Sequence, residues 1–292
     1  MPRPLVQDPG RIVTWRATDG VVLRGREWAP TGDIAPRGLV LFLHGIQSHS
    51  GWYAWTCGNL ARAGYRVLAP DRRGSGMNEG VRGHAMSATQ WIDDTTGWLR
   101  EAKPRTGQRA ALLGVSWGAK LAVATARRHP ELVDALGLLY PGLYSRFELR
   151  WHQRWRLAVA RGIGLWHKRI PIPLDDPALF TDEPAWREFI RHDPLSLREM
   201  TVGFLAATLD LDELARGALG LVQPLLLMTA RRDAIVDNAK TVDWFAQQPA
   251  ADKTLLDYDG CHTLEFEPRR EAVLTDLIRW LDRTLGGSGA IG

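Results

Sequence analysis

The stretch that decides the fold is Ala110-Ala111-Leu112-Leu113-Gly114-Val115-Ser116-Trp117-Gly118-Ala119, in which an apolar run leads into a G-x-S-x-G pentapeptide. The run Ala110–Leu113 is short, uncharged and continuous, as expected of a buried strand. Residues Ala119–Arg128 follow with the pattern of a helix. A serine between two glycines at such a junction lies on a tight turn, because small flanking residues let the strand and the helix approach closely. Ser116 is therefore the candidate nucleophile.

Short apolar runs alternate with longer amphipathic segments on both sides of this turn. The alternation predicts an α/β fold, with a mostly parallel sheet covered by helices on both faces. Asp19-Gly20 lies between two alternating runs and marks a hairpin, so the sheet is expected to begin antiparallel. The eight predicted strands are Arg11–Thr18, Val21–Trp28, Leu39–Leu43, Arg66–Ala69, Ala110–Leu113, Leu136–Leu139, Leu225–Thr229 and Thr254–Tyr258. The predicted helices are Trp55–Ala63, Ala88–Ala102, Ala119–Arg128, Asn238–Gln247 and Arg269–Leu285, followed by a frayed Gly-rich tail at 286–292.

The alternation stops between Gly142 and Gln223. This segment has several helical patterns and no convincing strand, and it is too long to be a loop within a compact α/β domain. We therefore expect a core domain formed by residues 1–141 and 224–292, with a helical cap inserted at 142–223.

Two polar residues follow the last two predicted strands in the order that a serine nucleophile requires. Asp233 comes after the first of these strands and His262 after the second. The carboxyl ends of parallel strands meet at one edge of a sheet, so Ser116, Asp233 and His262 are expected to converge as a catalytic triad. His262 would take the serine proton, and Asp233 would orient the imidazole. Asp237 is the competing candidate for the acid.

Serine attack on a carbonyl forms an oxyanion, which needs backbone N–H donors. One donor is expected from Trp117, directly after the serine and at the start of a helix, where the helix dipole favours negative charge. The second is expected from the loop after Leu39–Leu43, where the Ile46 amide is the candidate. His44 in the same loop is interpreted as a side chain that braces the loop, in preference to a base or a metal ligand.

Several motifs together resemble those of the monoacylglycerol lipases and lysophospholipases in the α/β-hydrolase superfamily. Residues 44–53, His-Gly-Ile-Gln-Ser-His-Ser-Gly-Trp-Tyr, resemble their HGxxEHSxRY stretch, and residues 71–83 resemble their DxxGxGxSxGxR run. The surroundings of Ser116, Asp233 and His262 match their GxSxG, GxxDxIV and GxxHxxxxE motifs. The resemblance implies the α/β-hydrolase fold and a serine hydrolase that cleaves lipophilic carboxylic esters through an acyl-enzyme.

Two other functions stay open at this point. A peptidase or amidase of the proline iminopeptidase type would need acidic cap residues to hold a substrate amine, whereas the first part of this cap is basic. A non-catalytic, ligand-binding member of the fold is disfavoured by the apparently complete triad.

Tryptophan is unusually frequent, with 13 Trp against 5 Tyr and 7 Phe. Trp52 follows the oxyanion loop, and Trp151, Trp155 and Trp186 lie in the cap, so these four are candidate substrate-binding residues of an apolar acyl pocket. Between Phe147 and Lys168 the apolar residues recur at helical spacing beside several arginines. We expect this stripe to pack over the active site. The alternative is transient contact of the basic helix with an anionic membrane surface.

Composition excludes several other classes of protein. The chain has 292 residues, 45% apolar and 24% charged, which is an ordinary globular balance, and its net charge of +4 comes without a nucleic-acid-binding motif. Cys57 and Cys261 are far apart and show no metal-ligand spacing, so we expect two free thiols and no metal or cofactor. The first residues have no apolar signal segment, which predicts a cytoplasmic protein.

Overall fold

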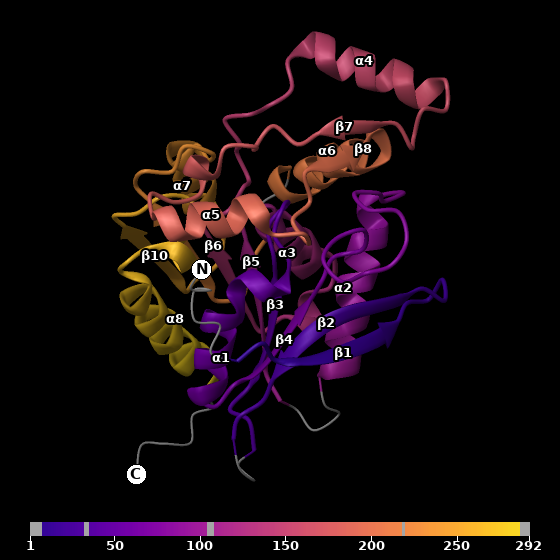
Figure 1. The fold of residues 1–292 in the computed structure, drawn as a ribbon. Coiled ribbons are helices and arrows are strands. Elements are labelled where there is room, and N and C mark those ends of the chain that lie inside the picture. Colours follow the sequence, from indigo (N-terminus) through magenta and orange to yellow (C-terminus); the bar gives the residue numbers. More distant parts are fainter. Residues whose placement is uncertain (1–7, 32–34, 104–107, 218–219, 287–292) are drawn as a thin grey trace, which may run out of the picture.

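A computed structural model describes residues 8–31, 35–103, 108–217 and 220–286. Eight strands form one sheet in the order β1-β2-β4-β3-β5-β6-β9-β10 (Figure 1). Their bounds are β1 Arg11–Arg16, β2 Val22–Trp28, β3 Leu39–Leu43, β4 Arg66–Pro70, β5 Ala110–Val115, β6 Ala135–Leu139, β9 Leu225–Ala230 and β10 Lys253–Tyr258. The tail that the sequence predicts to fray lies outside the described residues from position 287 onward.

The sheet is antiparallel at one edge and parallel elsewhere. β1 pairs with β2 and β2 with β4 in antiparallel fashion. The remaining neighbouring pairs of this sheet are parallel, so the predicted hairpin and the predicted mostly parallel sheet are confirmed. β5 extends to Val115, which brings the strand to the residue before Ser116.

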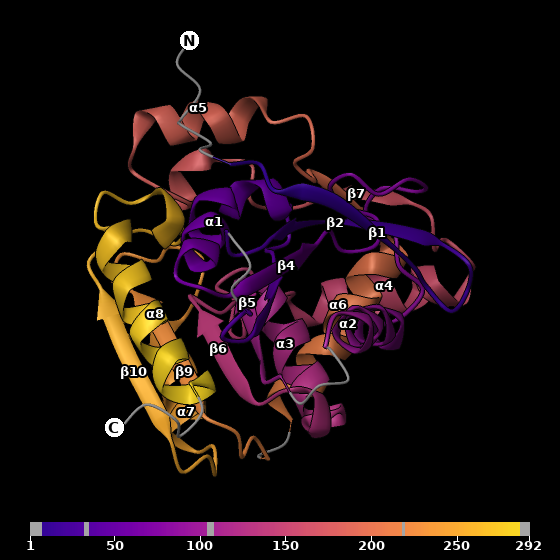
Figure 2. The same ribbon diagram turned by 90° about the horizontal axis from the view of Figure 1, so that it is seen from below.

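Helices cover both faces of the sheet, as Figure 2 shows. α1 and α8 pack on one face, and α2 and α3 pack on the other. Alternate residues of β3 point to opposite faces, with Leu41 in the α2–α3 core and Phe42 in the α1–α8 core. A strand buried on both faces must be apolar throughout, which explains its uninterrupted run. The helices are α1 Ala54–Arg62, α2 Ala88–Ala102, α3 Trp117–Arg128, α4 Trp151–Gly162, α5 Pro184–His192, α6 Val202–Arg216, α7 Asn238–Ala246 and α8 Arg270–Leu285.

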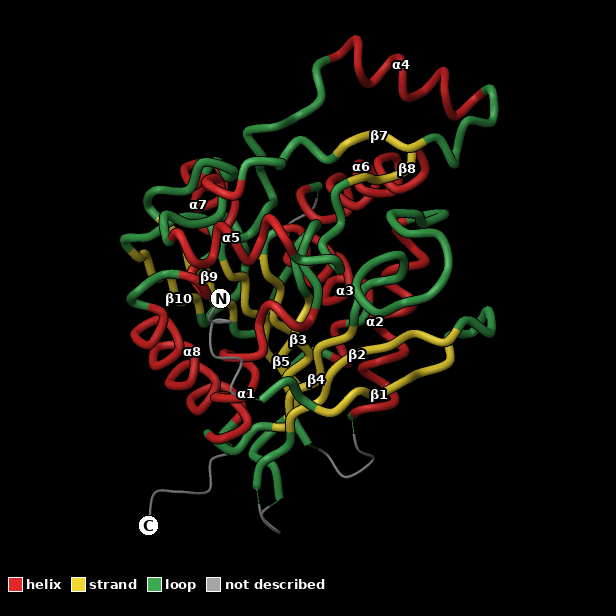
Figure 3. The backbone as a smooth tube through the Cα atoms, viewed as in Figure 1, coloured by secondary structure: helices red, strands yellow, loops and turns green. Residues whose placement is uncertain are grey.

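The chain between β6 and β9 lies above the carboxyl ends of the parallel strands (Figure 1). It contains α4, α5 and α6, and Figure 3 shows that loops connect α4 to the rest of this segment. Two short strands, β7 (Arg169–Pro171) and β8 (Glu199–Thr201), pair antiparallel within it, so the prediction that this segment has no strand is wrong. Three residues are too few to show an alternating pattern, and these strands form because distant parts of the chain meet.

Within the described ranges, no helix combines the length and the apolar character needed to cross a bilayer.

Candidate active site

Ser116 lies on the turn between β5 and α3, with φ 50° and ψ −119°. Residues other than glycine seldom adopt this backbone region, so neighbouring contacts must hold the turn. A Cβ atom on Gly114 would lie 2.6 Å from the Ala119 Cα atom, and one on Gly118 would lie 2.4 Å from the Leu43 carbonyl oxygen. Both glycines are therefore required, because the elbow packs against its own helix and against β3. α3 begins at Trp117, two residues before the predicted start.

The side chains of Ser116, His262 and Asp233 form a chain of hydrogen bonds. His262 Nε2 lies 2.9 Å from Ser116 Oγ, and His262 Nδ1 lies 2.7 Å from Asp233 Oδ2. The other carboxylate oxygen of Asp233 accepts hydrogen bonds from the amides of Ile235 and Val236, at 2.8 and 2.9 Å. Both the carboxylate and the imidazole are buried. With Nδ1 donating to the carboxylate, Nε2 is free to accept the serine proton.

Asp237, the competing acid, is occupied elsewhere. It is the N-cap of α7, and its carboxylate accepts a hydrogen bond from the Lys240 amide at 3.2 Å. This hydrogen bond is the main reason that the pKa of Asp237 lies below its ordinary value. The structure thus brings Asp233 to His262. An aspartate directly before a helical pattern is a capping signal. This signal marks Asp237 as an N-cap and so distinguishes it from Asp233 in the sequence.

Ile46 and Trp117, whose amides are the candidate oxyanion donors, line the same cavity as Ser116. Within the described residues, neither amide has a backbone acceptor. His44 braces the Ile46 loop, because its Nε2 accepts from the Arg72 amide at 2.9 Å and its Nδ1 donates to the Gly45 carbonyl at 2.8 Å. Burial and the charge of Arg72 lower the pKa of His44 well below its ordinary value, so this imidazole is neutral. The structure gives His44 the bracing position that the sequence suggests.

A cavity of about 290 Å³ opens at Ser116. Apolar side chains from the insertion and from the loop after β9 form much of its wall: Ile170, Ile172, Leu174, Met200, Leu205, Leu209 and Ile235. Five charged side chains also line the cavity: Lys120, Glu148, Arg154, Asp212 and Arg216. Its two carboxylates are paired, since Asp212 lies 2.5 Å from the Lys120 ammonium and Glu148 lies 3.0 Å from the Arg216 guanidinium. The cavity is therefore lined by apolar side chains together with two ion pairs and the guanidinium of Arg154.

None of the four tryptophans predicted to bind substrate lines the large cavity. Trp52 is buried and donates to Asp193 Oδ2 at 2.6 Å, and it lines a much smaller cavity together with Ser116 and His262. Trp186 stacks on Phe266, with ring centroids 4.3 Å apart.

Trp151 and Trp155 on α4 are 81% and 65% exposed, and neither lines the large cavity. α4 turns its Gln153, Arg154 and Leu157 face inward, so its tryptophan stripe faces outward. Periodicity reveals an apolar stripe but not which way the stripe points.

The sequence prediction missed the charged side chains that line the cavity. Lys120 lies one helical turn after Ser116, and Leu209, Asp212 and Arg216 recur at three-to-four spacing along α6. That spacing places them on one helix face, which is the signal that was available. No sequence pattern indicates that this face meets α3.

Comparisons with known proteins identify the family of this chain and several of its relatives. The family model described as "Serine aminopeptidase, S33" matches residues 34–269. The monoacylglycerol lipase of Mycolicibacterium smegmatis is 26% identical over 260 residues, covering 87% of this chain and 90% of the relative. Phospholipase YtpA of Bacillus subtilis is 25% identical over 247 residues, covering 82% of this chain and 92% of the relative.

A solved structure of a soluble variant of monoglyceride lipase from Saccharomyces cerevisiae has a TM-score of 0.84 at 20% identity, covering 97% of this chain and 99% of that one. This likeness shows that the architecture is the α/β-hydrolase fold. Since the family model spans most of the sequence, the chain belongs to the serine aminopeptidase S33 family.

Proposed function

We propose that the protein is a serine hydrolase of lipophilic carboxylic esters, of the monoacylglycerol lipase and lysophospholipase type. The observation that carries the proposal is the hydrogen-bonded chain Ser116–His262–Asp233, whose serine lines a largely apolar cavity. Relatives that match most of this chain are named monoacylglycerol lipase and phospholipase, which supports the same substrate class.

The proposed reaction has two halves. Ser116 Oγ attacks the ester carbonyl carbon while His262 Nε2 takes its proton, and the oxyanion is bound by the amides of Ile46 and Trp117. His262 then returns the proton to the departing alcohol, which leaves an acyl group on Ser116. Water, activated by the same imidazole, releases the carboxylic acid. Asp233 stabilises the imidazolium in both halves.

Peptide hydrolysis is the second candidate, because the family takes its description from an aminopeptidase. An aminopeptidase must bind a free substrate amine next to its nucleophile. The two carboxylates that line the cavity, Asp212 and Glu148, are already paired with Lys120 and Arg216, which supports the ester over the amine-bearing peptide. Turnover of aminoacyl-naphthylamides compared with acyl esters separates the two functions.

A fluorophosphonate probe tests the nucleophile directly. We expect labelling of the wild type together with turnover of p-nitrophenyl esters, and the loss of both in Ser116→Ala. Circular dichroism of the variant controls for folding. A wild-type protein that is neither labelled nor active would contradict the proposed function.

We further propose that α4 contacts the surface of anionic lipid aggregates, where lipophilic esters are found. Trp151, Trp155 and Ile163 are 81%, 65% and 68% exposed on this part of the insertion. Exposed cations accompany them, and within the described residues none of these four pairs with a carboxylate: Arg150, Arg156, Arg161 and Lys168. No Asp or Glu occurs between positions 149 and 174. Exposed aromatic rings beside unopposed cations suit an anionic interface.

Vesicle co-sedimentation tests this contact. We expect binding to vesicles of phosphatidylcholine with phosphatidylglycerol, weakened by salt and by the double substitution Trp151→Ser with Trp155→Ser. Val222→Ser is the matched control, because Val222 is 67% exposed and lies outside α4. Equal binding by the double variant and the control would rule the contact out.

We also propose a cytoplasmic location. Cys57 and Cys261 are free and buried, as expected in a reducing compartment. Fractionation of the native cell, followed by probe labelling of each fraction, tests this location.

A further inference from the structure

Arg72, which follows β4, has a buried guanidinium directly behind the oxyanion loop. Its Nη1 donates to the Gly45 carbonyl at 3.1 Å, and its Nη2 donates to the Ile46 carbonyl at 2.8 Å and to Ser75 Oγ at 2.7 Å. Within the described residues no carboxylate lies within ion-pair distance of it. Its neighbour Arg73 differs, because it pairs with Asp94 at 2.8 Å. Burial of a cation without a paired anion costs free energy, so we expect these contacts with the loop to have a function.

The Gly45 carbonyl and the Ile46 N–H belong to the same peptide group. That carbonyl accepts two hydrogen bonds, from His44 Nδ1 at 2.8 Å and from Arg72 Nη1 at 3.1 Å. Hydrogen bonds to a carbonyl polarise the peptide and strengthen its own N–H as a donor, and a charged donor does so more than a neutral one. The guanidinium also holds the Ile46 carbonyl, so it restrains the Ile46 amide from both sides.

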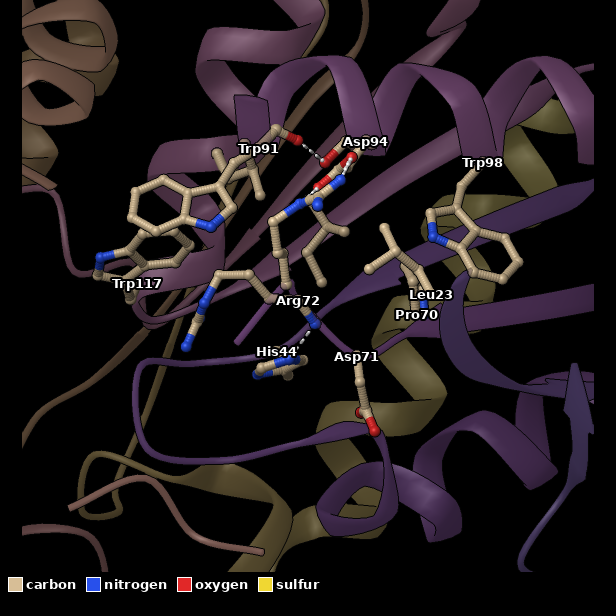
Figure 4. A pocket seen from close by; sticks show the side chains of 13 residues that line it. Leu23, His44, Pro70, Asp71, Arg72, Trp91, Asp94, Trp98 and Trp117 are labelled. Carbon is tan, nitrogen blue, oxygen red and sulfur yellow. Dashed lines mark hydrogen bonds and ion pairs between the residues drawn. The ribbon is translucent and has the colours of Figure 1, made fainter. Parts of the chain in front are cut away.

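The same guanidinium contacts the residue that carries the second donor. Arg72 Cζ lies 4.3 Å from the centroid of the Trp117 ring, and Figure 4 shows the Arg72 side chain alongside that ring. Trp91 packs against Trp117 in a T-shaped arrangement, with the two ring centroids 4.9 Å apart. Burial lowers the pKa of Arg72 to about 9, so the group remains charged at neutral pH.

We propose that Arg72 is a positioning residue of the oxyanion hole, which orients and polarises the Gly45–Ile46 peptide and connects it to Trp117. This inference rests on the proposed function, in which the Ile46 and Trp117 amides bind the oxyanion. Arg72 does not touch substrate and acts through these two residues.

The test compares Arg72→Met and Arg72→Lys with the control Arg73→Met, which removes an arginine that does not contact the loop. We expect Arg72→Met to lower kcat per fluorophosphonate-titrated site by roughly 10- to 100-fold, somewhat less than the loss of a whole oxyanion donor, with KM within about 2-fold. Arg72→Lys should recover part of kcat. The Ki of a boronic acid, whose tetrahedral adduct places an anionic oxygen in the same hole, should rise by the same factor as kcat falls.

A purely structural role would lower the melting temperature and the number of titratable sites, but not kcat per site. If Arg72→Met matches Arg73→Met in kcat per site, the inference is overturned. If Arg72→Met does not fold, Arg72→Lys decides, and an unchanged kcat and boronate Ki would overturn the inference equally. An inactive wild type would instead refute the underlying function, so the two failures are distinguishable.

Discussion

Asp233 and Asp237 lie four residues apart and have the same side chain, but their carboxylates have different roles. Asp233 is buried, and its carboxylate accepts from two backbone amides and from His262. Asp237 begins α7 and accepts from the Lys240 amide. The carboxylate of Asp233 contacts a ring nitrogen of His262, whereas the carboxylate of Asp237 caps the N-terminus of α7.

The substitutions Asp233→Asn and Asp237→Asn should therefore have unlike effects. We expect Asp233→Asn to lower kcat by about 10⁴-fold, because an amide does not hold the imidazole in the required tautomer. Asp237→Asn should leave kcat unchanged, since asparagine caps a helix as well as aspartate does. Steady-state kinetics with a p-nitrophenyl ester measures both. Comparable losses in the two variants would contradict the assignment of the acid.

Glu265 is a buried carboxyl group that lies three residues after His262. It accepts hydrogen bonds from the amide of Thr56 at 3.2 Å and from the Thr56 hydroxyl. Burial raises the pKa of Glu265 from its ordinary value of 4.5 to about 7. The folded protein thus keeps this proton at pH values where the unfolded chain has released it.

This difference predicts the sign of a pH effect on stability. Between about pH 4.5 and pH 7 the folded state binds more protons than the unfolded state, so the free energy of unfolding contributed by Glu265 falls as pH rises. Glu265→Gln should remove this dependence. We expect it to raise the free energy of unfolding at pH 8 by about 3 kcal/mol, with little change at pH 4. Urea titrations of both proteins at pH 4 and pH 8 measure the free energy of unfolding. If the substitution changes it equally at the two pH values, the Glu265 carboxyl is not a buried neutral group in the folded protein.

At the scale of elements, the strand–turn–helix junction of β5 and α3 depends on close backbone contact. A Cβ atom added to Gly118 would lie 2.4 Å from the Leu43 carbonyl oxygen and 2.6 Å from the His44 carbonyl oxygen. Both are backbone atoms of the strand and loop that carry the Ile46 amide. Relief of the contact requires β3 and α3 to separate.

Gly118→Ala should therefore lower both stability and activity. We expect a loss of roughly 1–3 kcal/mol in the free energy of unfolding, as for overpacked cores, and a lower kcat because the oxyanion loop is displaced. Gly162→Ala is the matched control. Gly162 is the last residue of α4, and no atom lies within 4 Å of a Cβ added there. Thermal denaturation and ester kinetics measure both variants. If Gly118→Ala has the same stability and kcat as the control, the turn accommodates a Cβ atom and the close contact is not required.

At the scale of the whole molecule, the segment between β6 and β9 and the elements around the sheet together line the cavity at Ser116. Its volume of about 290 Å³ corresponds to about ten heavy atoms, if each takes the roughly 30 Å³ of a water molecule in the liquid. Ile172 and Leu209 come from the segment between β6 and β9, whereas Lys120 comes from α3. The size of the site is thus a property of how the two parts pack.

That volume predicts a limit on the acyl chain. We expect kcat/KM to rise about 4-fold for each added methylene, from about 0.8 kcal/mol per buried CH₂, and to level off near ten carbons. A series of p-nitrophenyl esters from two to sixteen carbons measures the profile. A maximum at two carbons, or a rise that continues to sixteen, would contradict the cavity as the acyl site.

Much of this molecule can be predicted from short stretches of sequence. The strand before Ser116 is a continuous apolar run because both faces of its sheet are covered, and the helix α2 has the bounds that its periodicity predicts, Ala88–Ala102. The brief strands β7 and β8 escape prediction because three residues carry no period. The division into core and cap at 142–223 stays a prediction.

The sequence by itself determined the identity and order of the candidate triad, since Ser116, Asp233 and His262 each follow a recognisable strand and parallel strands share one edge. Tertiary structure decided which way α4 points, how Asp212 is paired, and that the guanidinium of Arg72 lies behind Ile46. The physical reason is range. Turn chemistry and periodicity act between near neighbours in the chain, whereas orientation and charge pairing depend on contacts between segments that only folding brings together.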